Sequence, residues 1–144
     1  MATSEALLQQ TLVKMLAQCY PDIVTVLSLS GTRLHGTPKQ KAQILSEWYS
    51  QGFIKGIFDL QLLLPESKLL NLELKKPFGG TQSPDQKLME SRLHSLGHNY
   101  HIIRDIPTVF KLIAESTTTL FRTKQYESYG SKLPIRGIKA YYHI

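Results

Sequence analysis

Apolar and polar residues alternate along two neighbouring segments in the middle of the chain. Residues 57–64 and 69–76 are rich in Leu and Ile, and the turn-forming sequence Pro-Glu-Ser-Lys separates them. Alternation places one set of leucines on a common apolar face: Leu60, Leu62, Leu64, Leu70, Leu72 and Leu74. The opposite face carries polar side chains, among them Asp59, Glu73 and Lys75. The pattern predicts a two-stranded hairpin with one apolar and one polar face.

The length of the connection decides whether the polar residues of this hairpin meet. Side chains that pair across antiparallel strands share a face, so Asp59 must lie opposite Glu73 or Lys75 to form a site with them. A connection of three or five residues gives this result. A four-residue connection pairs Asp59 with Leu74 and sends the two acids to opposite faces, unless a bulge intervenes.

The rest of the pattern predicts helices and strands in alternation. The expected helices span residues 4–19, 38 to about 51, 84–96 and 106–115, and the further strands span 23–29 and 99–104. We expect two helices to bury apolar stripes: Ala42, Ile44, Leu45 and Trp48 in the second, and Leu88, Met89, Leu93 and Leu96 in the third. This order favours an α/β domain with a central mixed β-sheet flanked by helices.

The helix that begins at Pro84 has the clearest start signal in the chain. Ser83 stands at the N-cap position, Pro84 at the first helical position and Gln86 at the third. This is the spacing of a capping box, in which the side chains at both ends bond to each other's backbone N–H. Gln86 therefore has a structural role available to it.

Two acids and a lysine on neighbouring strands indicate a metal site. An acid in an apolar strand is costly unless it is solvated, paired or bound to metal. The carboxylates of Asp59 and Glu73 are hard oxygen ligands that suit Mg²⁺ or Mn²⁺. Lys75 points to the same face and can activate a water or neutralise charge on a phosphate. These residues predict metal-assisted phosphodiester hydrolysis, and the alternative is a solvated polar face with an ordinary Glu/Lys pair.

The charge of the chain is compatible with a polyanionic partner. It carries 17 basic and 11 acidic residues, for a net charge of +6. From residue 117 onward five basic residues stand against one acid, which gives 5 − 1 = +4 of that total among interleaved aromatic residues. These aromatic and basic residues suit either DNA or docking onto a second subunit. The candidate DNA contacts are Arg33, Lys55, Lys76, Arg122 and Lys124.

Other features narrow the class of protein. At 144 residues the chain is long enough for one domain with a core. It has no run of eighteen apolar residues and no secretory signal pattern at its start, so we expect no membrane partner. The single cysteine, Cys19, favours a reduced, intracellular setting.

The ordered string of these residues resembles a known family. It comprises Gly56-Ile-Phe-Asp-Leu60, Leu72-Glu-Leu-Lys75, Gly79 to Ser83, Gln86 and Gly97. It is similar to the virus-type replication–repair nuclease (VRR-Nuc) domain of the PD-(D/E)xK superfamily over roughly residues 4–113. Phe58 stands where that family usually has a Pro, which is not a ligand. The resemblance implies a restriction-endonuclease-like fold, with residues 1–116 as the nuclease domain and 117–144 as its basic, aromatic C-terminal extension.

The resemblance also implies roles for the candidate residues. Asp59 and Glu73 would bind Mg²⁺ or Mn²⁺ together with the backbone carbonyl of Leu74. Related nucleases carry a further acid on the first helix, which helps to hold the metal directly or through a water, and Glu5 is the matching position. The alternative for Glu5 is a favourable interaction with the helix dipole.

In the same family, Lys75 would position and activate water, and Gln86 would orient this water or the scissile phosphate. Stand-alone VRR-Nuc domains resemble viral or bacterial proteins that resolve four-way junctions. The resemblance therefore implies a Holliday junction resolvase, acting on branched or duplex DNA as a homodimer, without a nucleotide cofactor, in the cytoplasm of a bacterium or phage-infected cell. The alternatives are a less selective endonuclease or nickase, a non-catalytic DNA-binding module, and a structural subunit of a larger assembly.

Overall fold

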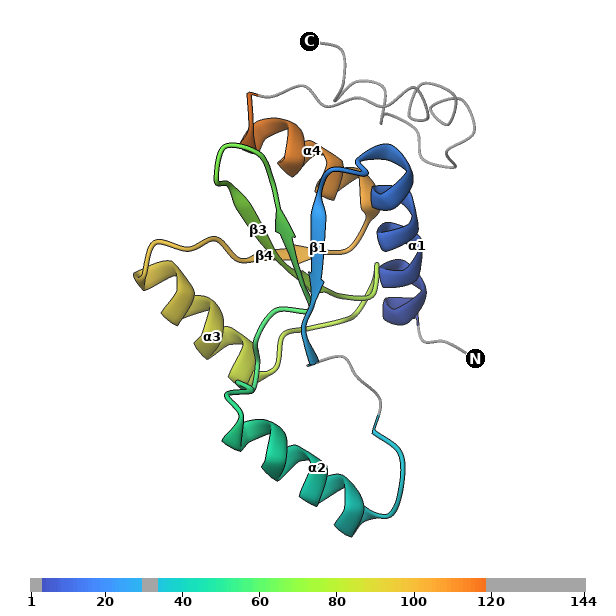
Figure 1. Cartoon of the computed structure of the whole chain (residues 1–144), viewed down its shortest axis with the longest axis vertical. Coiled ribbons are helices and arrows are strands. Elements are labelled where there is room, and N and C mark those ends of the chain that lie inside the picture. Colours follow the sequence, from blue (N-terminus) through green and yellow to red (C-terminus); the bar gives the residue numbers. More distant parts are fainter. Residues whose placement is uncertain (1–3, 30–33, 119–144) are drawn as a thin grey trace.

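The computed structural model describes residues 4–29 and 34–118, which form helices and strands in alternation (Figure 1). The elements are α1 (Ser4–Cys19), β1 (Val24–Leu27), α2 (Pro38–Ser50), β2 (Leu60–Leu63), β3 (Leu69–Leu74), α3 (Pro84–Ser95), β4 (His101–Ile103) and α4 (Ile106–Ser116). Within these residues the sheet has the order β1-β2-β3-β4. The first two pairings are antiparallel and β3 pairs with β4 in parallel, so the predicted mixed sheet is confirmed.

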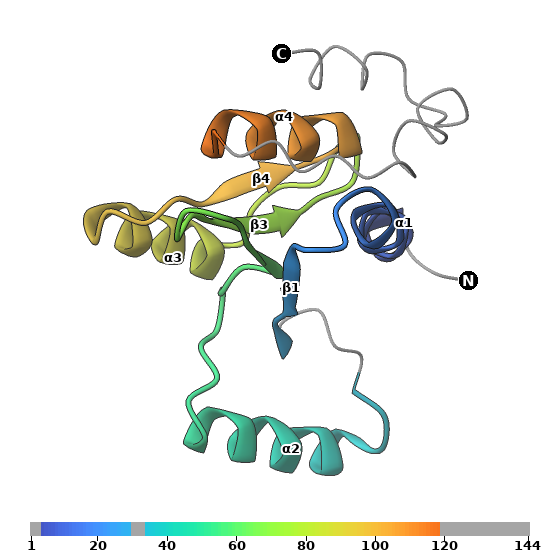
Figure 2. The same cartoon turned by 45° about the horizontal axis from the view of Figure 1, so that its top comes forward.

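The core lies between the apolar face of the sheet and helices α1 and α4, which run over that face (Figure 2). The predicted alternation of leucines in β2 and β3 is confirmed, because the leucines of the apolar face are all buried. The buried cluster is Leu12, Met15, Leu16, Cys19, Tyr20, Ile23, Leu60, Leu62, Leu64, Leu70, Leu72, Leu74, Ile103, Ile106, Val109, Phe110 and Ile113. This packing fixes β3 as the strand from which the polar residues project.

The connection between β2 and β3 has the length that brings the predicted acids together. The last pair of the ladder is Leu63 with Leu69, so five residues (69 − 63 − 1) connect the strands. Beyond Leu60 and Leu72 the backbone leaves this register, because the N–H of Asp59 donates to the carbonyl of Leu72 at 2.9 Å. The Asp59 carboxylate still reaches the end of β3, where it accepts the N–H of Leu74 at 2.8 Å, and its charge acts on Glu73. The two acids therefore share a site through the Asp59 side chain.

Strand β2 begins later than the sequence pattern predicts. The expected strand starts at residue 57, but the ladder starts at Leu60. The chain before it lies against the start of α3, where a Cβ on Gly56 would be 2.5 Å from the carbonyl oxygen of Asp85. Gly56 also has φ of +81°, which favours glycine. This close approach turns the chain away from β3, so the prediction of a strand over 57–59 was wrong.

The polar face of the hairpin is buried instead of solvated. Glu73 is only 2% exposed and Lys75 only 8%. Beside them, buried Asn71 bonds through its side chain and backbone to Asn99, and its Oδ1 accepts a hydrogen bond from Gln61 at 2.9 Å. This network joins β2 and β3 to the segment before β4. The alternative of a solvated face with an ordinary Glu/Lys pair is therefore wrong.

Helix α2 projects away from the sheet (Figures 1 and 2). Its start carries a capping box between Thr37 and Gln40, but none of its 13 described residues is buried. The predicted burial of Ala42, Ile44, Leu45 and Trp48 was wrong, because within residues 4–29 and 34–118 Ala42 is exposed and the other three are only partly buried. The predicted stripe of α3 was also partly wrong, since Leu88 is 61% and Leu96 72% exposed while Met89 is buried.

The described chain ends just beyond α4. Thr118 donates a backbone hydrogen bond to Glu66 Oε1 at 3.0 Å, at the tip of the β2–β3 connection. None of the helices in the described part is long and apolar enough to cross a membrane. Residues 1–3, 30–33 and 119–144 lie outside the described residues, and with them the candidate DNA contacts Arg33, Arg122 and Lys124.

Candidate active site

Four residues that the sequence singles out meet at one end of the β2–β3 pair. Asp59 comes directly before β2, Glu73 is near the end of β3, and Lys75 follows it. Gln86 joins them from the first turn of α3. The fold thus brings together residues that are up to 27 positions apart (86 − 59).

At the end of the ladder, the side chain of Asp59 accepts a hydrogen bond that a backbone carbonyl would otherwise accept. The main-chain N–H of Leu74 donates to Asp59 Oδ2 at 2.8 Å. Had the antiparallel ladder continued, this N–H would have bonded to the carbonyl of Phe58. This hydrogen bond holds the Asp59 carboxylate against the edge of β3.

The carbonyl of Leu74 faces the same edge as Asp59. The N–H of Lys75 donates to the carbonyl of Ile103 on β4 at 2.9 Å, on the other side of β3. Because the peptide is trans and planar, the Leu74 carbonyl points opposite to the Lys75 N–H. The oxygen that the resemblance assigns to the metal is therefore directed toward the Asp59 side.

Gln86 forms the predicted capping box and also contacts two residues of the cluster, while its role toward water or phosphate stays a prediction. Its backbone N–H donates to Ser83 Oγ at 3.2 Å, and its Oε1 accepts from the Ser83 N–H at 2.9 Å, so the capping box is present. The same Oε1 accepts a hydrogen bond from Lys75 Nζ at 2.8 Å, and its Nε2 donates to Glu73 Oε1. One amide thereby joins the helix start to the two charged groups.

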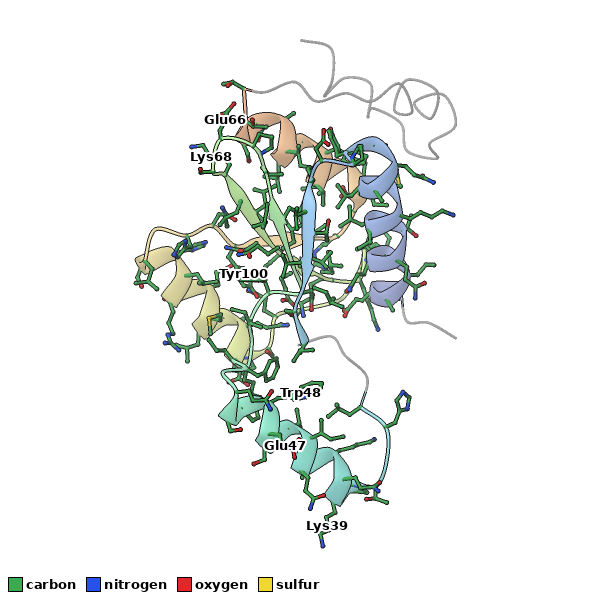
Figure 3. The ribbon with its side chains drawn as sticks, in the orientation of Figure 1. Lys39, Glu47, Trp48, Glu66, Lys68 and Tyr100 are labelled. Atoms are coloured by element: carbon green, nitrogen blue, oxygen red, sulfur yellow. The ribbon has the colours of Figure 1, made fainter. Side chains whose placement is uncertain are left out.

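Tyr100 is a site residue that the sequence analysis missed. Its hydroxyl donates to Glu73 Oε2 at 3.3 Å, from a side chain that lies between α3 and the strands (Figure 3). Burial, and then the charge of Glu73, raise the pKa of Tyr100, so the hydroxyl keeps its proton and remains a donor. Nothing in the local spacing marks this residue, because its contact with Glu73 depends on the parallel pairing of β3 and β4.

The Glu73 carboxyl is held in an unfavourable environment for a negative charge. Burial, and secondly the charge of Asp59, raise its pKa to about 8. Lys75, whose Nζ lies 3.5 Å from Glu73 Oε1, and the Tyr100 hydroxyl both act in the opposite direction. Burial and Asp59 prevail, so the pKa of Glu73 lies above its ordinary value, and a bound cation would favour the ionised carboxylate.

The donor set fits a small, hard divalent cation. Two carboxylates and a backbone carbonyl offer oxygen atoms only, and Mg²⁺ or Mn²⁺ completes such a set with water. A cation would also relieve the repulsion between Asp59 and Glu73. Residues of the chain that would hold it are Asp59, Glu73 and Leu74 through its carbonyl.

Comparison with known proteins supports this arrangement at the level of the fold. No family model and no curated protein matches the sequence. Two solved structures match the chain: a "VRR_NUC domain protein" (TM-score 0.55, 17% identity, 81% of this chain and 89% of the other) and a "VRR_NUC domain" (TM-score 0.50, 22% identity, 78% and 96%). The chain has the fold of a VRR-Nuc domain. The restriction-endonuclease-like α/β fold that the resemblance implied is confirmed.

The acid that the VRR-Nuc resemblance places on the first helix is not part of the cluster. Glu5 is half-buried in the first turn of α1. Among the described residues, no group of three or more Asp, Glu, His or Cys side chains is arranged to hold a metal. The metal-binding role of Glu5 therefore stays a prediction.

The two described lysines among the candidate DNA contacts flank this cluster. Lys55 is exposed and pairs with Asp85 at 3.3 Å, beside the start of α3. Lys76 is exposed directly after Lys75, and its carbonyl accepts a hydrogen bond from Arg104. Their contact with DNA is untested.

A cleft of about 250 Å³ opens beside the site. It is lined by Leu29, Leu34, Leu45, Trp48, Tyr49, Phe53, Lys55, Gly56, Ile57, Asp59, Ser83, Asp85 and Gln86. Phe53 packs against Trp48 and Tyr49, with ring centroids 5.8 and 5.3 Å apart. Trp48 lies at the end of α2 nearest to the rest of the molecule (Figure 3). The carboxylate of Asp59 and the amide of Gln86 are thus open to a ligand from this side.

Proposed function

We propose that the protein is a divalent-cation-dependent endonuclease that hydrolyses phosphodiester bonds in DNA. The observation that carries the proposal is the cluster of four side chains at one end of the sheet: Asp59, Glu73, Lys75 and Gln86. A buried acid such as Glu73 beside a second acid is costly for stability, and this cost is typical of functional sites. The names of the two similar structures agree with a nuclease domain.

The residues divide the chemistry between them. Asp59, Glu73 and the Leu74 carbonyl would hold the cation, which when bound would supply Lewis-acid polarisation of the scissile phosphate. Lys75 is nearly buried, and its Nζ is held by Gln86 at 2.8 Å and by Glu73 at 3.5 Å. From there its ammonium group orients the attacking water and stabilises the charge that develops on the phosphate.

Gln86 positions Lys75 and Glu73 relative to each other. The water oxygen forms a bond to phosphorus and the water gives one proton to solvent. The bond from phosphorus to the leaving oxygen breaks, and this oxygen takes up a proton from solvent. A rigid arrangement of the groups around the phosphate lowers the activation barrier, because the entropy of ordering these groups is lost on folding and not during the reaction.

The preferred substrate in this proposal is branched DNA. One such domain has one catalytic centre, and a four-way junction needs two symmetric cuts, which a two-fold homodimer would supply. The resemblance of the sequence to stand-alone VRR-Nuc domains supports this choice. Light scattering of the purified protein measures whether it is a dimer.

The test is cleavage of a labelled four-way junction beside the matching linear duplex, with Mg²⁺ or Mn²⁺ and with Lys75→Ala as the inactive control. Paired symmetric cuts on the junction, absent in the variant, support the resolvase. Equal cutting of both substrates would support the nuclease activity and contradict the preference for the junction. Binding without cutting in either metal would overturn the proposal and leave a DNA-binding module.

A further inference from the structure

The connection between β3 and α3 presents an aromatic ring to solvent. Phe78 is 91% exposed, the highest value among the large apolar side chains that the structure describes. Its ring leaves an apolar area of about 150–250 Å² in water. Isolated apolar residues on a surface are common, so exposure alone has no functional meaning. What distinguishes Phe78 is the way in which its loop is held and where the loop begins.

Arg104 holds both ends of this loop. Its Nη1 donates to the carbonyl of Lys76 at 2.8 Å and its Nη2 to the carbonyl of Gly80 at 2.6 Å. The two carbonyls lie on either side of Phe78 in the sequence. One planar guanidinium group thus bridges the loop at its base and fixes its geometry.

The two ends of the loop are also packed against each other. A Cβ on Gly80 would lie 3.2 Å from the backbone nitrogen of Lys76 and 3.6 Å from Cβ of Lys75. Gly79 has φ of +81°, which favours glycine and closes the turn. Phe78 is therefore the tip of a tight loop whose base touches the proposed catalytic lysine.

The distance from Phe78 to the reacting phosphate is bounded by the chain itself. Phe78 is three residues beyond Lys75, so their Cα atoms are at most about 11 Å apart. One step along a DNA strand is about 3.4 Å. A ring at this position reaches bases within about three steps of a phosphate that is held at Lys75.

We propose that Phe78 is a wedge that inserts into the base stack of DNA beside the scissile phosphate. The proposal rests on the proposed nuclease function and names the class of substrate. Apolar wedges of this kind unstack neighbouring bases, and the unstacking costs least where the stack is already broken. DNA is favoured over a protein partner because the base of the loop is formed by the catalytic Lys75 and the exposed Lys76.

The wedge selects DNA by its local structure. At a branch point or a nick, a base can stack on the ring without losing a partner in the duplex. In continuous duplex the same contact first requires unstacking, so the gain is largely cancelled. Phe78 thus favours branched over linear DNA.

The experiment measures unstacking and affinity without cleavage. Protein with Lys75 intact, kept in EDTA so that no divalent cation supports cleavage, is titrated into four-way junctions and linear duplexes that carry the fluorescent base 2-aminopurine at steps near the cut. The expected result is a rise in fluorescence on the junction at one to three steps from the cut. Adding Phe78→Ala abolishes this rise and weakens junction binding about 5- to 150-fold, as loss of one base–aromatic stack implies, with little change on linear duplex.

Two further variants serve as controls. Phe78→Trp keeps an aromatic ring and is expected to restore the fluorescence rise and the affinity. Leu96→Ala removes an exposed apolar side chain at the end of α3, and is expected to leave both quantities unchanged. Circular dichroism and light scattering on each variant check folding and assembly.

The outcomes separate the wedge from the nuclease. Unchanged unstacking and binding in Phe78→Ala overturn the wedge, while cleavage by protein with Lys75 intact still supports the nuclease. A dimer that dissociates in Phe78→Ala, with unchanged binding per subunit, also overturns the wedge and assigns the ring to a second copy of the chain. Unstacking that depends on Phe78 in a protein that never cuts DNA supports the wedge and overturns the nuclease.

Discussion

Lys75 Nζ donates a hydrogen bond to Gln86 Oε1 at 2.8 Å, and this contact ties β3 to the first turn of α3. The same oxygen atom accepts the N–H of Ser83 at the helix start. The position of the proposed catalytic lysine is thereby coupled to the cap of a helix. We therefore expect stability and activity to depend on the same side chain, that of Gln86.

Gln86→Ala is expected to impair both properties, whereas Ser83→Ala impairs stability only. Loss of the Ser83 cap costs about 1 kcal/mol of unfolding free energy. Loss of the Gln86 amide removes the cap partner and also frees Lys75 and Glu73, so cleavage falls by about 100-fold. Urea denaturation and single-turnover cleavage measure the two effects. Equal activity in the two variants would contradict the coupling.

The raised pKa of Glu73 predicts how stability depends on pH without metal. Its pKa is about 8 in the folded protein against an ordinary value of 4.5, so the folded state binds more protons between these pH values. This group therefore makes the free energy of unfolding fall as pH rises through that window. Glu73→Gln is expected to be more stable than the wild type at pH 8.5, with a smaller difference at pH 5.

Urea denaturation in the presence of EDTA measures this difference. The matched control is Glu115→Gln, because Glu115 is exposed and only forms a surface pair with Lys111 at 3.9 Å. Its effect is expected to stay below about 1 kcal/mol at both pH values. A stability gain in Glu73→Gln that does not grow with pH would contradict the assignment.

The Tyr100 hydroxyl is expected to adjust the pH at which the metal binds. Its hydrogen bond to Glu73 favours the ionised carboxylate, so Tyr100→Phe raises the pKa of Glu73 further. Because the metal displaces the proton of Glu73, half-maximal Mn²⁺ binding then moves to higher pH. Titration of Mn²⁺ at several pH values measures the shift. Tyr49→Phe is the control, since Tyr49 lies on the aromatic side of the cleft.

Arg104 is expected to support substrate choice without taking part in the chemistry. Arg104→Ala removes both hydrogen bonds at the base of the Phe78 loop. Junction binding is expected to weaken as it does in Phe78→Ala. The double variant Phe78→Ala/Arg104→Ala is expected to bind the junction no more weakly than Phe78→Ala alone. Competition binding on junction and linear DNA measures this. Full additivity of the two substitutions would argue against a shared role.

The sequence predicts those parts of the molecule that depend on local pattern. Alternating leucines place Leu62 and Leu72 in the core, and the spacing of Ser83 and Gln86 predicts the cap. The short hairpin also brings Asp59 and Glu73 to the same end of the sheet. These relations join residues that are close in the sequence, so hydrophobic periodicity and turn length are enough to predict them.

The parts that the sequence does not predict depend on contacts between distant segments. Strand β2 starts late because Gly56 meets the backbone of Asp85. Helix α2 has an apolar stripe that is only partly buried by the rest of the described chain, so its pattern wrongly indicates a buried face. Tyr100 becomes a partner of Glu73 only through the parallel pairing of β3 with β4. Hydrophobic periodicity along the sequence does not indicate such contacts between distant segments.

The central claim is that Asp59 and Glu73 hold a divalent cation. Calorimetric titration of Mn²⁺ into the wild type, Asp59→Asn and Glu73→Gln tests it most directly. Asp85→Asn is the control, because Asp85 lines the same cleft but pairs with Lys55. The account predicts saturable binding by the wild type and by Asp85→Asn, and a loss of at least about 100-fold in affinity in each of the other two variants. Absence of binding by the wild type, or binding that survives both substitutions, would contradict it.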